Sequence, residues 1–98
     1  MHLWIYEAKY HFTVCTWLYS EGSQESTPHL VHVLKQSEDE DARYSACEAL
    51  TVWGDCRALP ALDHAAQHDN GCDYEERPIK EVARKAIEAI QQRYPEEF

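Results

Sequence analysis

DEDARYSACEALTVWGD, residues Asp39 to Asp55, is the stretch that decides how the rest of the chain is interpreted. Its apolar residues recur at spacings of three and four, which predicts an α-helix with one apolar face. That face consists of Ala42, Ala46, Ala49, Leu50 and Trp53. Because alanines form its centre, a second helix can approach to the short end of the usual range of about 8–10 Å between axes. The stretch therefore predicts a helix that is stacked against other helices.

The acidic run 38–41 in front of this helix has a structural explanation. A carboxylate at a helix start accepts hydrogen bonds from free backbone N–H groups and faces the positive end of the helix dipole, which contributes about 0.3–1 kcal/mol per charge. We expect the run to cap the helix, and an acidic recognition patch is the alternative interpretation.

Turn residues divide the second half of the chain into further helices. Gly54 is expected to end the first helix and Asp55 to cap the next one, over 56–68, with Pro60 about one turn from its start. The polar turn at 69–71 is expected to end that helix.

Two more segments also have helical signals. A shorter helix is predicted for 26–36, with Ser26 or Thr27 as its cap and Pro28 in its first turn. A C-terminal stripe at the same helical spacing consists of Ile79, Val82, Ala83, Ala86, Ile90 and Tyr94.

An internal repeat organises the whole chain. A shift of 32 residues aligns Leu18, Gly22, Pro28, Leu30 and His32 with Leu50, Gly54, Pro60, Leu62 and His64. A shift of 40 residues aligns Ala46, Glu48, Ala49 and Leu50 with Ala86, Glu88, Ala89 and Ile90. Self-similarity of this kind is typical of solenoids, whose units each need a neighbour to cover their apolar face. We expect one domain over 1–98, with a helix pair at 3–36, a second pair at 39–68, a single helix at 79–94 and an acidic tail at 95–98.

Residues 39–69 resemble the short HEAT-like repeat of the phycobilisome-lyase type. The matching positions are Arg43, Ala46, Ala49, Leu50, Gly54, Asp55, Leu59 and Leu62. The resemblance implies an all-α fold, a short right-handed α-solenoid of about five helices in two and a half HEAT-like repeats. One departure is Trp17, which stands where the second unit has Ala49, so the first helix cannot pack as closely. As an alternative function, the resemblance implies bilin lyase or isomerase activity, which absorbance titration with a bilin would detect.

Composition excludes several partners. The formal net charge of −9 argues against nucleic acid and against an anionic membrane surface, because both require basic groups. The four cysteines form no CxxC pair and no signal peptide is evident, so a cytoplasmic location is expected. Met1 and the acidic tail are what we expect of a complete small protein.

Histidines and basic residues suggest a partner-binding groove lined by the second helices. Equivalent repeat positions place His32 beside His64, and the expected lining is His29, His32, Lys35, Arg57, His64 and His68. We expect this groove to bind another protein or peptide, with no cofactor. If the histidines titrate within the interface, binding should weaken below about pH 6.5. An alternative is a metal site formed by His32, His64 and His68, with Asp63 or Cys72 contributing.

Aromatic residues suggest a second contact surface. Trp4, Tyr6 and Tyr10 belong to an N-terminal segment that is apolar almost all round, which predicts a protein contact or a homodimer face. The alternative is a terminal core rich in aromatic residues. Tyr74, amid acidic residues in the loop at 69–78, is a further exposed candidate.

No catalytic constellation is found in the sequence. Cys15 and Cys47 are interpreted as packing residues, and the carboxylates around Cys72 discourage its thiolate. The sequence therefore predicts a small non-catalytic HEAT-like scaffold or adaptor that mediates a protein–protein interaction.

Overall fold

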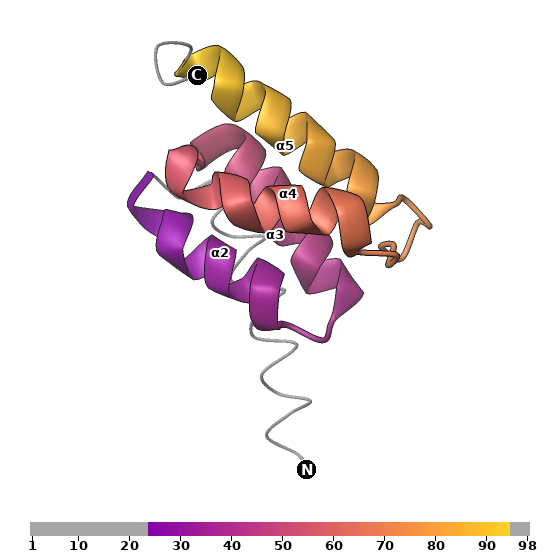
Figure 1. Ribbon diagram of the computed structural model, residues 1–98. Coiled ribbons are helices and arrows are strands. Elements are labelled where there is room, and N and C mark those ends of the chain that lie inside the picture. Colours follow the sequence, from indigo (N-terminus) through magenta and orange to yellow (C-terminus); the bar gives the residue numbers. More distant parts are fainter. Residues whose placement is uncertain (1–23, 95–98) are drawn as a thin grey trace.

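The structure is a computed structural model that describes residues 24–94. It consists of a 3₁₀ turn η1 (Gln24–Ser26), helices α2 (Thr27–Gln36) and α3 (Glu40–Trp53), a 3₁₀ turn η2 (Cys56–Ala58), and helices α4 (Leu59–His68) and α5 (Ile79–Arg93) (Figure 1). The prediction of an all-α chain is thus confirmed for this part. The predicted N-terminal helix, with Trp4, Tyr6, Tyr10 and Trp17, lies outside the described residues, as does the tail at 95–98.

The four α-helices pack with α5 lying along two of the others. In Figure 1, α2 and α4 run side by side, α3 lies behind them, and α5 crosses over the top. The most extensive contacts join α3 to α5, α4 to α5 and α2 to α3, whereas α2 and α4 touch over a smaller area. The consecutive helices α3 and α4 are not among the closely packed pairs. In a simple stack of hairpins α3 would pack directly against α4. Here α5 instead lies between these two helices and contacts both of them.

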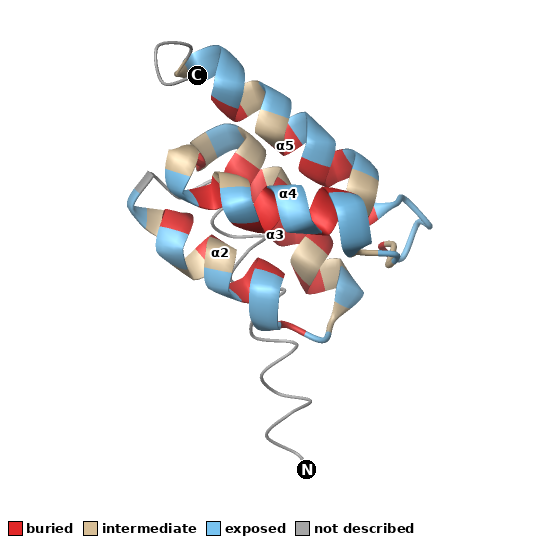
Figure 2. Cartoon of the chain, viewed as in Figure 1, coloured by how far each residue is buried: buried red, intermediate tan, exposed pale blue. Residues whose placement is uncertain are grey.

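The predicted apolar faces form the core of the described residues (Figure 2). On α3 the alanine face and Leu50 are fully buried, and Trp53 at its end is half-buried. On α5 the buried residues are Ile79, Val82, Ala83, Ala86 and Ile90. The expectation that alanines allow a close helix approach fits the extensive α3–α5 contact.

Two of the predicted helix caps are confirmed. The Asp39 carboxylate accepts a hydrogen bond from the Asp41 N–H at 3.0 Å, and the Asp55 carboxylate accepts one from the Arg57 N–H, also at 3.0 Å. Gly54 ends α3, at a φ of −65° that any residue adopts. Glycine is required there for space, because a Cβ would lie 2.5 Å from the Leu50 carbonyl oxygen.

The predicted cap position of α2 is confirmed at Ser26, with Pro28 in the first turn. The Ser26 side chain makes no capping hydrogen bond, because the chain enters α2 directly from the η1 turn. Thr27 is buried, and its Oγ1 has no hydrogen-bond partner among the described residues.

The C-terminal end of α3 is capped by a side chain from α5. The Arg93 guanidinium donates hydrogen bonds to the carbonyls of Leu50, at 3.3 Å, Thr51, at 2.8 Å, and Val52. These last-turn carbonyls lack partners within their own helix and carry the negative end of its dipole. Arg93 therefore joins the ends of α3 and α5.

Candidate functional site: a groove between α2 and α4

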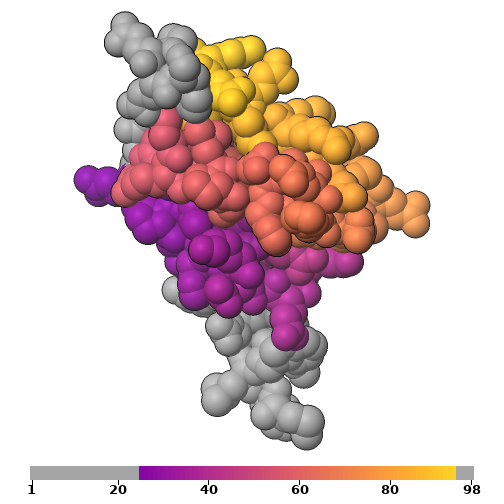
Figure 3. Space-filling view, viewed as in Figure 1, coloured from indigo at the N-terminus to yellow at the C-terminus, as the bar shows by residue number. Residues whose placement is uncertain are grey.

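A groove of about 740 Å³ opens where the C-terminal ends of α2 and α4 meet the start of α3. Its apolar lining is Leu34, Pro60, Ala61 and Ala65, and its charged or titratable lining is Lys35, Glu40, Arg43, His64, His68 and Asp69. In the space-filling view α4 forms a band between α2 and α5 (Figure 3). The groove therefore has an apolar part that can take an aliphatic side chain and a polar part beside it.

Arg43 joins the three helix ends that form the groove. Its Nε and Nη2 donate to the two carboxylate oxygens of Asp69, at 2.8 and 3.2 Å, and its Nη1 donates to the Ser37 carbonyl at 3.0 Å. The side chains of Arg43 and Asp69 are only 18% and 13% exposed, so solvent screens this ion pair poorly. Asp69 also accepts from the Gly71 N–H at 2.9 Å. The base of the groove is consequently fixed by bidentate, charge-assisted bonds.

Gly71 lies tightly against this ion pair. A Cβ at Gly71 would be 2.9 Å from both the Arg43 Nη2 and the Glu40 Oε1, and 3.1 Å from the Asp69 Oδ1. These neighbours are the ends of side chains, so they can move further than backbone atoms can. The turn after α4 therefore packs closely against the side chains of Arg43, Glu40 and Asp69.

Three of the predicted partner-binding residues line the groove: Lys35, His64 and His68. The two histidine rings lie one turn apart on α4, with their centroids separated by 4.8 Å. Lys35 and His68 occupy the last turns of their helices, where a cation also complements the helix dipole.

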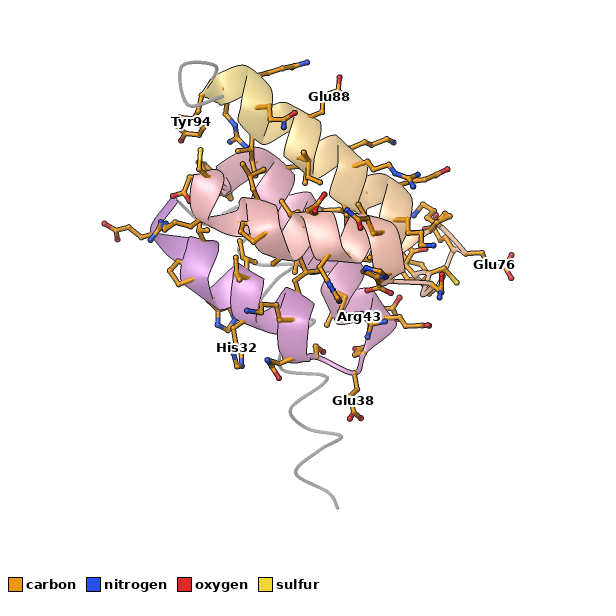
Figure 4. All side chains as sticks on the ribbon, in the orientation of Figure 1. His32, Glu38, Arg43, Glu76, Glu88 and Tyr94 are labelled. Atoms are coloured by element: carbon orange, nitrogen blue, oxygen red, sulfur yellow. The ribbon has the colours of Figure 1, made fainter. Side chains whose placement is uncertain are left out.

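The other predicted partner-binding residues, His29, His32 and Arg57, do not line this groove, and their part in binding stays a prediction. Neither His29, which is half-buried, nor His32 is part of the lining. Figure 4 shows Arg43 pointing toward the ends of α2 and α4, whereas His32 projects from the side of α2 that faces away from α4. Arg57 stands at the other end of α4, where its Nη2 lies 2.8 Å from the Asp55 Oδ2. Hydrogen bonds from the Arg57 side chain hold the pKa of the Asp55 carboxyl below its usual range.

The hypothesised metal site is not formed by the described residues. Across 24–94 no group of three or more His, Cys, Asp or Glu side chains is arranged to hold an ion. Asp63, which was expected to contribute, accepts a hydrogen bond from the Gln67 amide at 3.1 Å. His64 and His68 form a pair, but His32 points away from them.

The loop at 69–78 is an ordered structure built around Asp73. The buried Asp73 carboxylate accepts from the backbone N–H groups of Glu75, at 3.0 Å, and Arg77, at 2.8 Å, and from the Arg77 Nε at 2.8 Å. Burial by itself would raise the pKa of Asp73, but these hydrogen bonds outweigh it and hold the pKa below its usual range. The Arg77 guanidinium also lies over the Tyr44 ring, 4.6 Å from its centroid. The loop is therefore fastened to α3.

Tyr74 is the exposed tip of this loop, with 71% of its surface accessible. Its backbone N–H donates to the Asp41 Oδ1 at 2.7 Å, so the acidic run in front of α3 holds the loop as well as capping the helix. The structural interpretation of the acidic run is supported by both bonds. Tyr74 lies outside the α2–α4 groove.

Two side chains beside the loop have raised pKa values. Burial raises the pKa of the Glu48 carboxyl, and the carboxylates of Asp73 and Glu75 raise it further against the opposing effect of Arg77. Burial likewise raises the pKa of the Tyr44 hydroxyl, in spite of the nearby Arg77 guanidinium. Both groups flank a small pocket of about 150 Å³ between α3 and the loop.

Two of the described cysteines, Cys47 and Cys72, lie in settings that disfavour a reactive thiolate. Cys47 is fully buried in the core, as predicted for a packing residue. The pKa of the Cys72 thiol is raised by desolvation and then by the carboxylates of Glu40, Glu76 and Asp73. Because the thiolate is the nucleophilic form, this raised pKa disfavours the reactive form of Cys72.

Sequence reasoning missed the residues that build the groove. Arg43 was recognised only as a match to the repeat, and Asp69 only as a turn residue. One signal was available: an arginine beside the alanine face of a helix needs an acceptor, and Asp69 closes the next helix. The partners are 26 residues apart, so the pairing depends on how the helices dock.

No helix within residues 24–94 combines the length and the apolar character needed to cross a bilayer. A comparison of the chain with models of protein families, with curated proteins and with solved structures finds no match.

Proposed function

We propose that the protein is a small non-catalytic adaptor of HEAT-like build that binds another protein or a peptide in the α2–α4 groove. The observation that carries this proposal is the groove itself, about 740 Å³ in volume, with apolar and polar lining side by side. Its base is fixed by the Arg43–Asp69 pair, so the walls need little ordering when a ligand binds.

The HEAT-like build is supported by which helices lie together. The repeat predicts that first helices pack on first helices and second helices on second helices. The two first helices, α3 and α5, make the most extensive contact in the described part. The two second helices, α2 and α4, run side by side (Figure 1). The close approach of α4 to α5 departs from that pattern, and we infer that it closes the end of the array.

A non-catalytic role is supported by the chemistry of the groove. Its lining contains no cysteine, and its least exposed charged side chains, Arg43 and Asp69, are bound to each other. The raised pKa of the Cys72 thiol agrees with this role. Bilin lyase activity, a homodimer through the N-terminal aromatic residues and a cytoplasmic location stay predictions, tested by bilin titration, light scattering and cell fractionation.

The test is site-specific photo-crosslinking in the organism that encodes the chain. A photoreactive amino acid replaces His64 in the groove, and in a matched control it replaces Lys85, which is exposed on α5 outside the groove. We expect a discrete cross-linked protein from position 64 only, which mass spectrometry identifies and calorimetry confirms with purified components. The same products from both positions, or none from position 64, would contradict the proposal.

A further inference from the structure

We propose that the pair Asn70 and Gly71 is a site of spontaneous deamidation, and that the Arg43–Asp69 ion pair controls how fast it reacts. The inference does not depend on the proposed function, because it concerns the chemistry of the chain itself at the end of α4. Asn70 is the only asparagine in the sequence, and a glycine follows it directly. Asn70 is exposed, and both residues line the α2–α4 groove.

The reaction takes place between the Asn70 side chain and the backbone of the next residue. The Gly71 nitrogen attacks the Asn70 Cγ, the bond from Cγ to the side-chain nitrogen breaks, and that nitrogen leaves as ammonia with the proton that Gly71 loses. Solvent water then opens the cyclic imide at either of its carbonyls, which leaves aspartate or isoaspartate at position 70. Glycine favours the ring closure because it has no Cβ to hinder the attack.

The structure holds the attacking nitrogen in an unreactive arrangement. The Gly71 N–H donates to the Asp69 Oδ1 at 2.9 Å, and the Gly71 carbonyl oxygen accepts from the Ile79 N–H at 3.0 Å. Ring closure requires the nitrogen to lose its proton and to turn toward the Asn70 Cγ. The Asp69 carboxylate opposes both steps, because it holds the N–H in a hydrogen bond and disfavours a second negative charge beside it.

Arg43 determines how firmly Asp69 holds this nitrogen. The Asp69 Oδ1 that accepts from Gly71 also accepts from the Arg43 Nη2 at 3.2 Å, and the Asp69 Oδ2 accepts from the Arg43 Nε at 2.8 Å. Because both carboxylate oxygens are bound, Asp69 cannot turn away from Gly71 unless the ion pair opens. Arg43 therefore protects the Asn70 side chain from reaction through Asp69.

Reaction at Asn70 would alter the base of the groove. Isoaspartate adds one carbon to the main chain, and in either product a carboxylate replaces a neutral amide next to Asp69. Gly71 has little room to shift, since even a Cβ there would lie 2.9 Å from the Arg43 Nη2 and from the Glu40 Oε1. We expect the modified protein to lose the bidentate pair and to unfold at a lower urea concentration than the unmodified protein.

The test follows the mass of the full-length protein during incubation at mildly alkaline pH with a reducing agent. Exchange of an amide for a carboxylate gives a fixed gain in mass, and fragmentation assigns that gain to position 70. A peptide of residues 68–73 with blocked ends gives the rate for an unrestrained chain. We expect the folded protein to react at least about tenfold more slowly than the peptide, because a hydrogen bond to a charged group must break first.

Matched variants separate local protection from global stability. Arg43→Met should react at least about tenfold faster than the wild-type protein. Ile90→Ala, in the last turns of α5 and fully buried, should lose a comparable amount of global stability but react at nearly the wild-type rate. Asn70→Ser should show no gain in mass. Circular dichroism checks that each variant is folded.

Two outcomes would overturn the inference. One is a folded wild-type protein that reacts as fast as the peptide, and the other is an Arg43→Met variant that reacts no faster than Ile90→Ala. Neither outcome decides the proposed function, because cross-linking from position 64 reports independently whether a protein binds in the groove.

Discussion

Replacement of Arg43 by methionine should destabilise the protein more than any other single loss of charge in the groove. Methionine keeps the unbranched apolar stem but removes three hydrogen bonds, two to Asp69 and one to the Ser37 carbonyl. It leaves the Asp69 carboxylate, 13% exposed, with only the Gly71 N–H as a bonded partner in the described part.

The magnitude follows from these contacts. Hydrogen bonds to charged groups contribute about 1.5–3 kcal/mol each, and breaking a fully buried ion pair costs about 3–5 kcal/mol. Because both side chains retain some exposure, we expect a loss of about 2–3 kcal/mol in the free energy of unfolding. In a domain of this size such a loss lowers the melting temperature by roughly 10–20 °C.

Urea unfolding of Arg43→Met, Asp69→Asn and the double variant measures the coupling between the two side chains. We expect the double variant to lose less than the sum of the single losses, by about 1–2 kcal/mol. The loss for Arg43→Met should change little between 0.05 and 0.5 M salt, since a poorly exposed pair is weakly screened.

Arg57→Met is the matched control for this reasoning. Arg57 binds Asp55 with the same distance of 2.8 Å between nitrogen and oxygen, but its side chain is 58% exposed. We expect no measurable shift of its urea midpoint. A loss below about 0.5 kcal/mol for Arg43→Met, or strict additivity with Asp69→Asn, would refute the view that this pair fixes the base of the groove.

Three further substitutions test other parts of the structure. Gly54→Ala should lower the free energy of unfolding by about 1–3 kcal/mol in urea titrations, because the new Cβ would collide with the backbone. Gly71→Ala should lower it less, because its Cβ would meet the ends of side chains, which can move. Equal losses for the two variants would contradict this. Arg93→Gln should speed hydrogen exchange in the last turn of α3 and cost about 0.5–1 kcal/mol, and unchanged exchange would argue against the cap. Glu48→Gln should stabilise the protein at pH 7 but not below about pH 4. Because the pKa of Glu48 is raised in the folded state, the stabilisation that Glu48 gives when protonated is complete below its unfolded pKa and is lost as the pH rises through its folded pKa. An equal gain in the free energy of unfolding at both pH values would rule this out.

The described helices were largely predictable because their signals are local. Spacing of apolar residues and the turn residues Gly54 and Asp55 placed α3, α4 and α5 to within a few residues of their observed ends. These signals report contacts inside one helix or across one turn. The start of α2 was also predicted to within one residue, but the expected capping bond from the Ser26 side chain is absent, because the chain enters the helix from the η1 turn.

The groove was predictable only in part because it depends on how helices dock. The repeat register placed His32 and His64 at equivalent positions, but the groove is lined by the last turn of α2, one turn beyond His32. Arg93 reaches the carbonyl of Thr51, 42 residues away, and nothing in the local sequence of either residue indicates this bond. Long side chains that join separate helices are determined by the tertiary arrangement.

The position of α5 has a consequence for synthesis of the chain. Because residues 79–93 cover both α3 and α4, the apolar faces of residues 40–68 have no complete cover until α5 has left the ribosome. A longer solenoid can add its repeats one after another as they emerge, since each new unit needs only the one before it. In this chain α5 contacts both preceding helices, so we expect a nascent chain halted before residue 79 to expose apolar surface that chaperones recognise.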